Sequence, residues 1–212
     1  MKKFVRENSL SLVMTTLFVF ALLGQIGTGW DVYNQDQVDH GGEAVGIGQY
    51  LTSGHFGEAV FENWESEFLQ MGLFVVLTVW LRQKGSPESK SLSGREEVDR
   101  EPDPNRPGAP WPVRMGGVVE TVYAHSLAIA LFALFAMSFA LHVVTGAQEY
   151  SADQVAHGAA AVSPLQYLGT SQLWFESFQN WQSEFMSIGA LVVLAIFLRQ
   201  KGSPQSKPVD AD

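Results

Sequence analysis

The stretch FENWESEFLQMGLFVVLTVWLRQKGSPESK, residues 61 to 90, decides the fold, because it occurs twice in the chain. It returns as FQNWQSEFMSIGALVVLAIFLRQKGSPQSK at residues 178 to 207. The offset between Trp64 and Trp181 is 181 − 64 = 117 residues, and the two copies align without a gap. Each copy joins a polar N-W-x-S-E-F segment to a long apolar run and a basic ending. The sequence therefore indicates an internal duplication.

Four apolar segments alternate with polar, glycine-rich loops, and they lie near residues 9–29, 61–81, 121–145 and 178–198. A helix of about 20 residues crosses the roughly 30 Å core of a bilayer, and it satisfies its own backbone polar groups in lipid. The alternative, a soluble four-helix bundle, would show a polar stripe, and the runs LFVVLTVWL and ALVVLAIFL have none. We therefore predict an all-α membrane protein with four transmembrane helices.

The chain is expected to contain two tandem repeats of one helical hairpin each, at residues 1–84 and 119–212. Residues 85–118 join them and are rich in Pro, Gly, Ser and mixed charges, a composition typical of disorder. A repeat that crosses the membrane twice returns the chain to its starting side. The two repeats are therefore predicted to be parallel, related by an axis along the membrane normal.

The basic residues predict the orientation. All 13 fall before the first helix, in the linker, or after the last helix: Lys2, Lys3, Arg6, Arg82, Lys84, Lys90, Arg95, Arg100, Arg106, Arg114, Arg199, Lys201 and Lys207. Because basic segments stay cytoplasmic, both termini and the linker are expected inside, and loops 30–60 and 147–177 outside. Counted through Glu67 and Glu184, the outer side carries twelve acidic residues and no Lys or Arg. This charge could gather cations or simply keep the surface soluble.

The outer loops are long for connections between neighbouring helices, and we expect them to be partly helical. Short helices are predicted near Asp36–His40 and Tyr50–Glu58, at the membrane surface that Trp, Tyr and Phe favour. The same preference makes Trp64 and Trp181 anchors at the outer interface. The anchors predicted at the cytoplasmic ends of the helices are Arg82, Lys84, Arg199 and Lys201.

Two glutamates in the duplicated segment are the most informative candidates for function. An ionisable group within a spanning helix is costly and is by default a functional hypothesis. Glu67 follows Asn63 by four residues, which places both on one helix face, and the second copy repeats this arrangement. The candidate intramembrane polar site comprises Asn63, Glu67, Asn180, Glu184, Gln25 and His142, the last two as neighbours from partner helices. The alternative is structural: the glutamates bond to backbone or Trp groups and clamp the start of the helix.

A second recurring pattern is an Asp followed four residues later by a His. Asp36 and His40 form the first pair, and Asp153 and His157 the second. On a helix such a pair can hold a metal such as zinc, although two residues do not complete a tetrahedral site. A His followed by Gly is also an ordinary signal for the end of a helix.

Several classes of function lack support. The chain has no cysteine, which excludes disulfides, thiolate metal sites and a cysteine nucleophile. It contains no phosphate-binding loop, nucleophile elbow or zinc-protease motif. The basic segments only flank the predicted helices, and so nucleic-acid binding is not expected. We predict no cofactor and no enzymatic activity.

The segments FENWESEF, LRQKGSPESK and QYLTSGHF together resemble those of a family of small bacterial multi-pass membrane proteins, a domain of unknown function. The resemblance covers the chain outside the linker, and both copies match the N-W-x-S-E-F and L-R-Q-K-G-S motifs. It implies a bacterial plasma-membrane location and no particular activity. We predict a structural or partner-binding protein whose partners are the bilayer, a second copy or another membrane protein. The alternative is a small proton or cation channel or transporter that uses Glu67 and Glu184.

Overall fold

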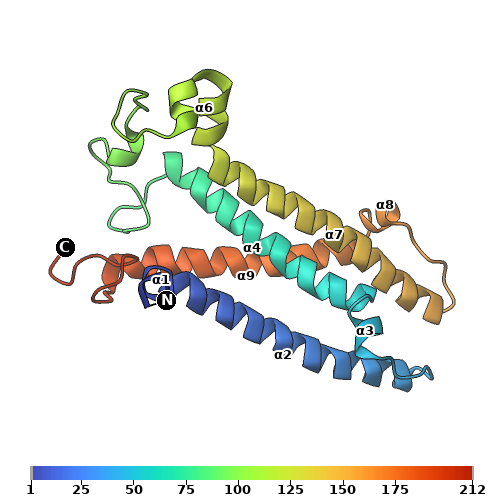
Figure 1. The fold of residues 1–212 in the computed structure, drawn as a ribbon. Helices are drawn as coiled ribbons and strands as arrows, with labels where there is room; N and C mark the ends of the chain where they lie inside the picture. The colour runs from blue at the N-terminus through green and yellow to red at the C-terminus, as the bar shows by residue number, and fades with distance from the viewer. Residues whose placement is uncertain (1, 212) are drawn as a thin grey trace. The chain divides into compact units, whose positions relative to one another are not determined.

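The computed structural model describes residues 2–211, in which helices and turns account for all regular structure and no β-strand occurs (Figure 1). The four long helices are α2 (Ser9–Asp39), α4 (Gly54–Trp80), α7 (Ser126–Ala156) and α9 (Ser171–Phe197). The short elements are α1 (Lys2–Glu7), α3 (Ile47–Tyr50), η1 (Glu97–Asp99), α5 (Trp111–Met115), α6 (Gly117–Ala124) and α8 (Pro164–Tyr167). The predicted all-α class is confirmed.

Within residues 2–211, three helices, and not the predicted four, are long and apolar enough to cross a membrane: α2, α7 and α9. The segment predicted at residues 61–81 is helical but belongs to α4, which begins at Gly54. The first half of α4, GHFGEAVFENWESE, carries four glutamates. The apolar stretch that remains in this helix is too short to span a membrane. The polar side chains Glu65, Ser66 and Gln70 of this helix are buried. Its composition therefore reflects packing against protein rather than exposure to lipid.

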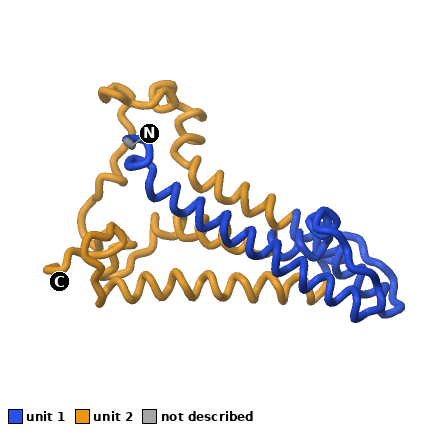
Figure 2. The backbone as a smooth tube through the Cα atoms, turned by 60° about the horizontal axis from the view of Figure 1, so that its bottom comes forward, with its two compact units in different colours: residues 1–60, 141–169 blue, residues 61–140, 170–212 orange. Residues whose placement is uncertain are grey.

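Two compact units divide the chain (Figure 2). The first comprises residues up to Val60 together with Leu141–Gly169, and the second comprises Phe61–Ala140 together with residues from Thr170 onward. Helices α4 and α7 contribute residues to both units. Each unit thus combines residues from the first and second halves of the chain, whereas the predicted domains followed the sequence halves and stay a prediction.

The helix bounds recur at the spacing seen in the sequence. Adding 117 to the bounds of α2, α3 and α4 gives 126–156, 164–167 and 171–197, which are the bounds of α7, α8 and α9. One side-chain contact recurs at the same spacing. Asn34 Oδ1 accepts the backbone N–H of Val45 at 2.7 Å, and at the corresponding positions Ser151 Oγ accepts that of Val162 at 2.9 Å. Such contacts close the chain after each long helix.

The L-R-Q-K-G-S-P-x-S-K segments form the same turn after α4 and α9. Arg82 Nη1 donates to the carbonyl of Val79 at 3.1 Å, and Arg199 Nη1 donates to that of Ile196 at 3.1 Å, so each arginine satisfies free carbonyls at a helix end. The glycine that follows has φ = 85° in the first copy and 84° in the second, which other residues rarely adopt. The L-R-Q-K-G-S-P-x-S-K motif thus has a structural role in both copies, because it ends the helix and turns the chain. Membrane anchoring by these cations stays a prediction.

The linker contains local structure. It includes η1 and α5, and Lys90 forms an ion pair with Asp99. The hydrogen bond from Lys90, followed by that from the Glu96 backbone, lowers the pKa of Asp99 below its usual value. Asp99 and Glu96 also form a capping box around η1. Disorder of this segment stays a prediction.

Candidate functional site

The second unit contains a pair of carboxyl groups formed by the two glutamates that the sequence singled out. Glu67 lies on α4 and is exposed, Glu184 lies on α9 and is half-buried, and the two carboxyl groups lie close enough to interact electrostatically. Asn63 and Asn180 lie one turn before them on the same helices. Two ionised carboxylates repel each other, and a proton on one of them allows it to donate a hydrogen bond to the other. The pair therefore has the composition of a proton-sharing site.

A buried hydrogen bond connects the same two helices near the pair. Ser177 Oγ of α9 donates to Glu65 Oε1 of α4 at 2.8 Å, and both side chains are fully buried. The comparison of the two halves missed Glu65 because its counterpart is Gln182. Within the second unit, α4 also contacts α7: a Cβ placed on Gly72 would lie 3.3 Å from Phe132 Cε1. These contacts pack α4 against α9 and α7 within the second unit.

The tryptophans predicted as interfacial anchors lie in aromatic contacts. Trp64 makes an edge-on contact with Phe61, with ring centroids 5.8 Å apart. Trp181 makes similar contacts with Phe178 at 5.4 Å and Trp174 at 6.5 Å. Among the described residues, the buried Nε1 of Trp181 has no hydrogen-bond partner. This indole therefore donates to no glutamate, and the structural alternative, which also allows backbone partners, stays a prediction.

The first unit contains a different polar cluster. Gln25 and His142, predicted as neighbours of the glutamates, both belong to this unit. His142 on α7 is fully buried, and its ring nitrogen lies within 4.8 Å of a carboxylate oxygen of Glu58 on α4. Tyr167 Oη of α8 donates to Glu58 Oε1 at 3.1 Å. The cluster of Glu58, His142 and Tyr167 was not predicted from the sequence.

The Asp/His pairs lie at helix ends and are exposed. His40 Nδ1 lies 2.9 Å from the carbonyl oxygen of Asp36 and 3.4 Å from its carboxylate. His157 makes the corresponding contacts with Asp153 at 2.9 Å and 3.3 Å. The hydrogen bond to the Asp36 backbone, followed by the charge of Asp36, raises the pKa of His40 above its usual value. This geometry fits the helix-end interpretation, because a protonated His is favourable beside terminal carbonyls.

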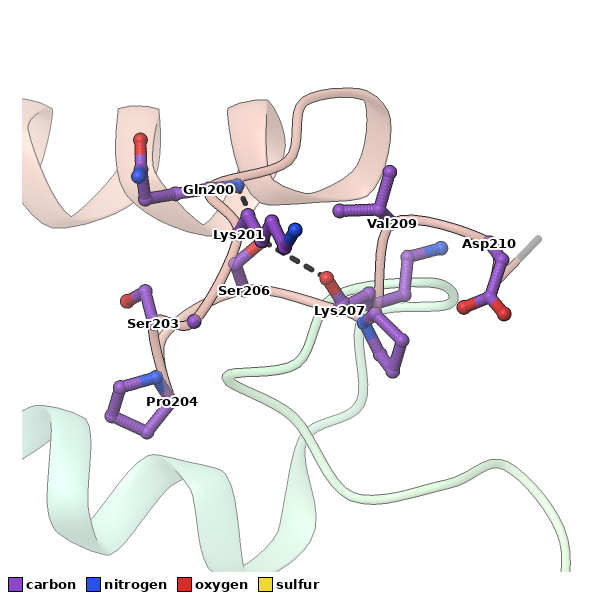
Figure 3. Close-up of a pocket in the computed structure, with 10 residues that line it drawn as sticks. Gln200, Lys201, Ser203, Pro204, Ser206, Lys207, Val209 and Asp210 are labelled. Carbon is purple, nitrogen blue, oxygen red and sulfur yellow. Dashed lines mark hydrogen bonds between the residues drawn. The ribbon is translucent and has the colours of Figure 1, made fainter.

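A hollow of about 590 Å³ lies in the C-terminal segment and is lined by residues between Gln200 and Asp210 (Figure 3). One local turn builds it: the backbone N–H of Gln200 donates to Ser206 Oγ at 2.9 Å, and Ser206 Oγ donates to the carbonyl of Lys207 at 3.1 Å. It contains none of the residues of the carboxyl pair or of the buried cluster.

Comparison with known proteins identifies a family for this chain. Residues 1–212 match the family described as Domain of unknown function (DUF6766). The chain belongs to this family. No curated protein and no solved structure matches the chain. The family match therefore agrees with the resemblance drawn from the motifs and assigns no molecular activity.

Proposed function

We propose that this chain is an integral membrane protein that binds and exchanges a proton or a small cation at the Glu67–Glu184 pair. The electrostatic interaction between these two carboxyl groups, one from each copy of the duplicated segment, carries this proposal. Two neighbouring carboxylates repel each other when both are ionised, and a shared proton or a bound cation relieves this repulsion. Glu184 lies in α9, one of the helices apolar enough to span a membrane, and an ionisable group in such a helix is costly and usually lies on an ion or proton route. The role is binding and transfer, without catalysis or a cofactor.

The test is the flux of protons and monovalent cations through liposomes that contain the purified protein. The wild type is compared with the double variant Glu67→Gln, Glu184→Gln, which removes the exchangeable charge and keeps side-chain size. The matched control is Glu43→Gln, Glu101→Gln, which changes the net charge equally at two exposed positions outside the long helices. We expect flux in the wild type and in the control, and none in the Glu67/Glu184 variant.

A second candidate function is structural or partner-binding, and the exposure of α2 favours it. This apolar helix has no buried residue, so its surface is available to lipid, to a second copy or to another membrane protein. The same experiment separates the two functions through thermal melting. A folded wild type without flux, together with a lower melting temperature in the Glu67/Glu184 variant, would refute transport and leave the glutamates as structural contacts between α4 and α9.

The proposed arrangement in the membrane is a pair of tandem repeats in a bacterial plasma membrane. The helix bounds that recur after 117 residues support the repeats. The positions of the basic residues support a cytoplasmic location for the termini and the linker. This arrangement requires α4 to cross the membrane with its polar side chains buried against protein, and it places loops 30–60 and 147–177 on the outer side, where the acidic residues concentrate. A second copy or another membrane protein covers the exposed apolar helices in this arrangement.

A further inference from the structure

The cluster of Glu58, His142 and Tyr167 brings metal-ligating groups together in a buried place. His142 is the only titratable residue in the first 18 residues of α7, and it is 0% exposed. A carboxylate oxygen of Glu58 lies within 4.8 Å of its ring nitrogen. An imidazole nitrogen and a carboxylate oxygen are ligands of zinc and of other divalent transition metals. Two such donors within this distance can bind the same ion.

Tyr167 and Gly146 support the carboxylate. Tyr167 is 0% exposed, and its hydroxyl donates to Glu58 Oε1 at 3.1 Å. Gly146 lies one turn after His142 on α7. A Cβ at this position would lie 2.7 Å from Tyr167 Cε1 and 2.9 Å from Glu58 Oε1, so only glycine leaves room for both groups. A hydrogen bond that orients a ligating carboxylate is typical of the outer shell of a metal site.

A comparison of the two halves of the chain shows which parts of this cluster occur in both copies and which occur in one. The first half also pairs a glycine with a tyrosine: a Cβ on Gly29 would lie 2.2 Å from Tyr50 Oη. The positions that correspond to His142 and Glu58 hold Gln25 and Phe175, at 142 − 117 = 25 and 58 + 117 = 175. The close helix contact is thus kept twice, whereas the imidazole and the carboxylate occur together once. Packing alone therefore does not account for the two donors.

We propose that Glu58 and His142 bind one divalent transition-metal ion, with Tyr167 as a positioning residue for Glu58. The two side chains supply one nitrogen and one oxygen ligand, and water can complete the coordination. Binding requires a neutral imidazole and an ionised carboxylate, so uptake of the ion releases any proton that they hold. The site does not involve Glu67 or Glu184, and it can therefore stand if the proposed flux fails.

The probe is Zn²⁺ itself, added to the full-length protein in detergent. The background variant His40→Gln, His157→Gln removes the exposed Asp/His pairs. Equilibrium dialysis followed by metal analysis should give one Zn²⁺ per chain. We expect His142→Gln and Glu58→Gln in this background to lose this Zn²⁺, and Tyr167→Phe to bind it about 10- to 100-fold more weakly. The matched control, His125→Gln, removes an exposed imidazole and should leave binding unchanged.

X-ray absorption of the zinc-loaded background protein keeps the proposal falsifiable if a variant fails to fold. One imidazole with oxygen ligands is the expected signature. A stoichiometry of zero in the background protein would overturn the proposal, as would a ligand set without imidazole. Equal zinc affinity in folded His142→Gln and Glu58→Gln would also overturn it, because the ion would then lie elsewhere.

Discussion

At the scale of single residues, Gly146 shows how little space separates the elements of the first unit. A Cβ added there would lie 2.7 Å from Tyr167 Cε1, which is closer than carbon atoms can approach. Replacement of Gly146 by Ala should lower the free energy of unfolding by about 1–3 kcal/mol, because overpacking shifts Tyr167 or the helix. Chemical denaturation in detergent micelles, followed by helix content, measures this change.

Gly24→Ala is the matched control, since Gly24 is also helical and no atom lies within 4 Å of its added Cβ. Alanine is a better helix former than glycine by about 1 kcal/mol. The control should therefore be neutral or stabilising. Equal effects of the two substitutions would mean that Tyr167 does not pack against Gly146.

The sequence could predict one group of functional candidates and not the other, for a physical reason. Comparison of the two halves finds residues that both copies keep, and it singled out Glu67 and Glu184, which lie together in the structure. It cannot find groups present in one copy only. Glu58 corresponds to Phe175, and its neighbours come from helices far away in sequence. The one available signal was His142, an imidazole within an apolar run.

At the scale of helices, composition predicted the type of element but not its ends. The first apolar segment was predicted to end near residue 29 and the second to begin near residue 61, whereas α2 continues to Asp39 and α4 begins at Gly54. The predicted ends were wrong because both helices continue through polar residues, which do not by themselves terminate a helix. Helix α2 ends where Gly41 adopts φ = 79°, a conformation that terminates helices. The short helix predicted near Asp36–His40 is therefore the last turn of α2.

The contact between α4 and α9 yields a prediction for helix packing. Ser177→Ala removes the hydroxyl that donates to the buried Glu65 carboxylate, and it should lower the free energy of unfolding by about 1–3 kcal/mol. Ser183→Ala on the same helix is the control, because Ser183 is exposed and its hydroxyl donates to the Asn180 carbonyl of its own helix at 2.8 Å. Denaturation midpoints of the two variants measure the difference. Indistinguishable midpoints would show that this hydrogen bond does not hold the helices together.

At the scale of the whole molecule, composition identifies the helices that could span a membrane, and it does not show how polar residues are packed. Helices α2, α7 and α9 are apolar enough to be recognised from the sequence alone. Residues 61–81 of α4 were predicted as a fourth span, but this helix is too polar for the same assignment. Its polar residues Glu65 and Gln70 are buried, and hydropathy does not distinguish a residue buried in protein from one exposed to water. The compact units escaped prediction because segments far apart in the chain build each of them.

The orientation of the chain can be measured directly, because the absence of cysteine allows single-cysteine labelling without background changes. Ser93→Cys in the linker should be protected from a membrane-impermeant thiol reagent added outside intact cells, since basic segments stay cytoplasmic. Glu43→Cys and Ala160→Cys should react. All three positions are exposed in the structure. Labelling of Ser93→Cys from outside would place the linker on the outer side and contradict the proposed orientation.

The composition of the two units also constrains the order of events during synthesis. The first unit requires Leu141–Gly169 in addition to the N-terminal segment, and the second requires residues from Thr170 onward. Domains commonly fold as they emerge from the ribosome, with the N-terminal domain first. Here no early domain exists: neither unit can be completed until most of the chain has been translated. The N-terminal helices therefore remain incompletely packed until the later segments of their own unit have been synthesised.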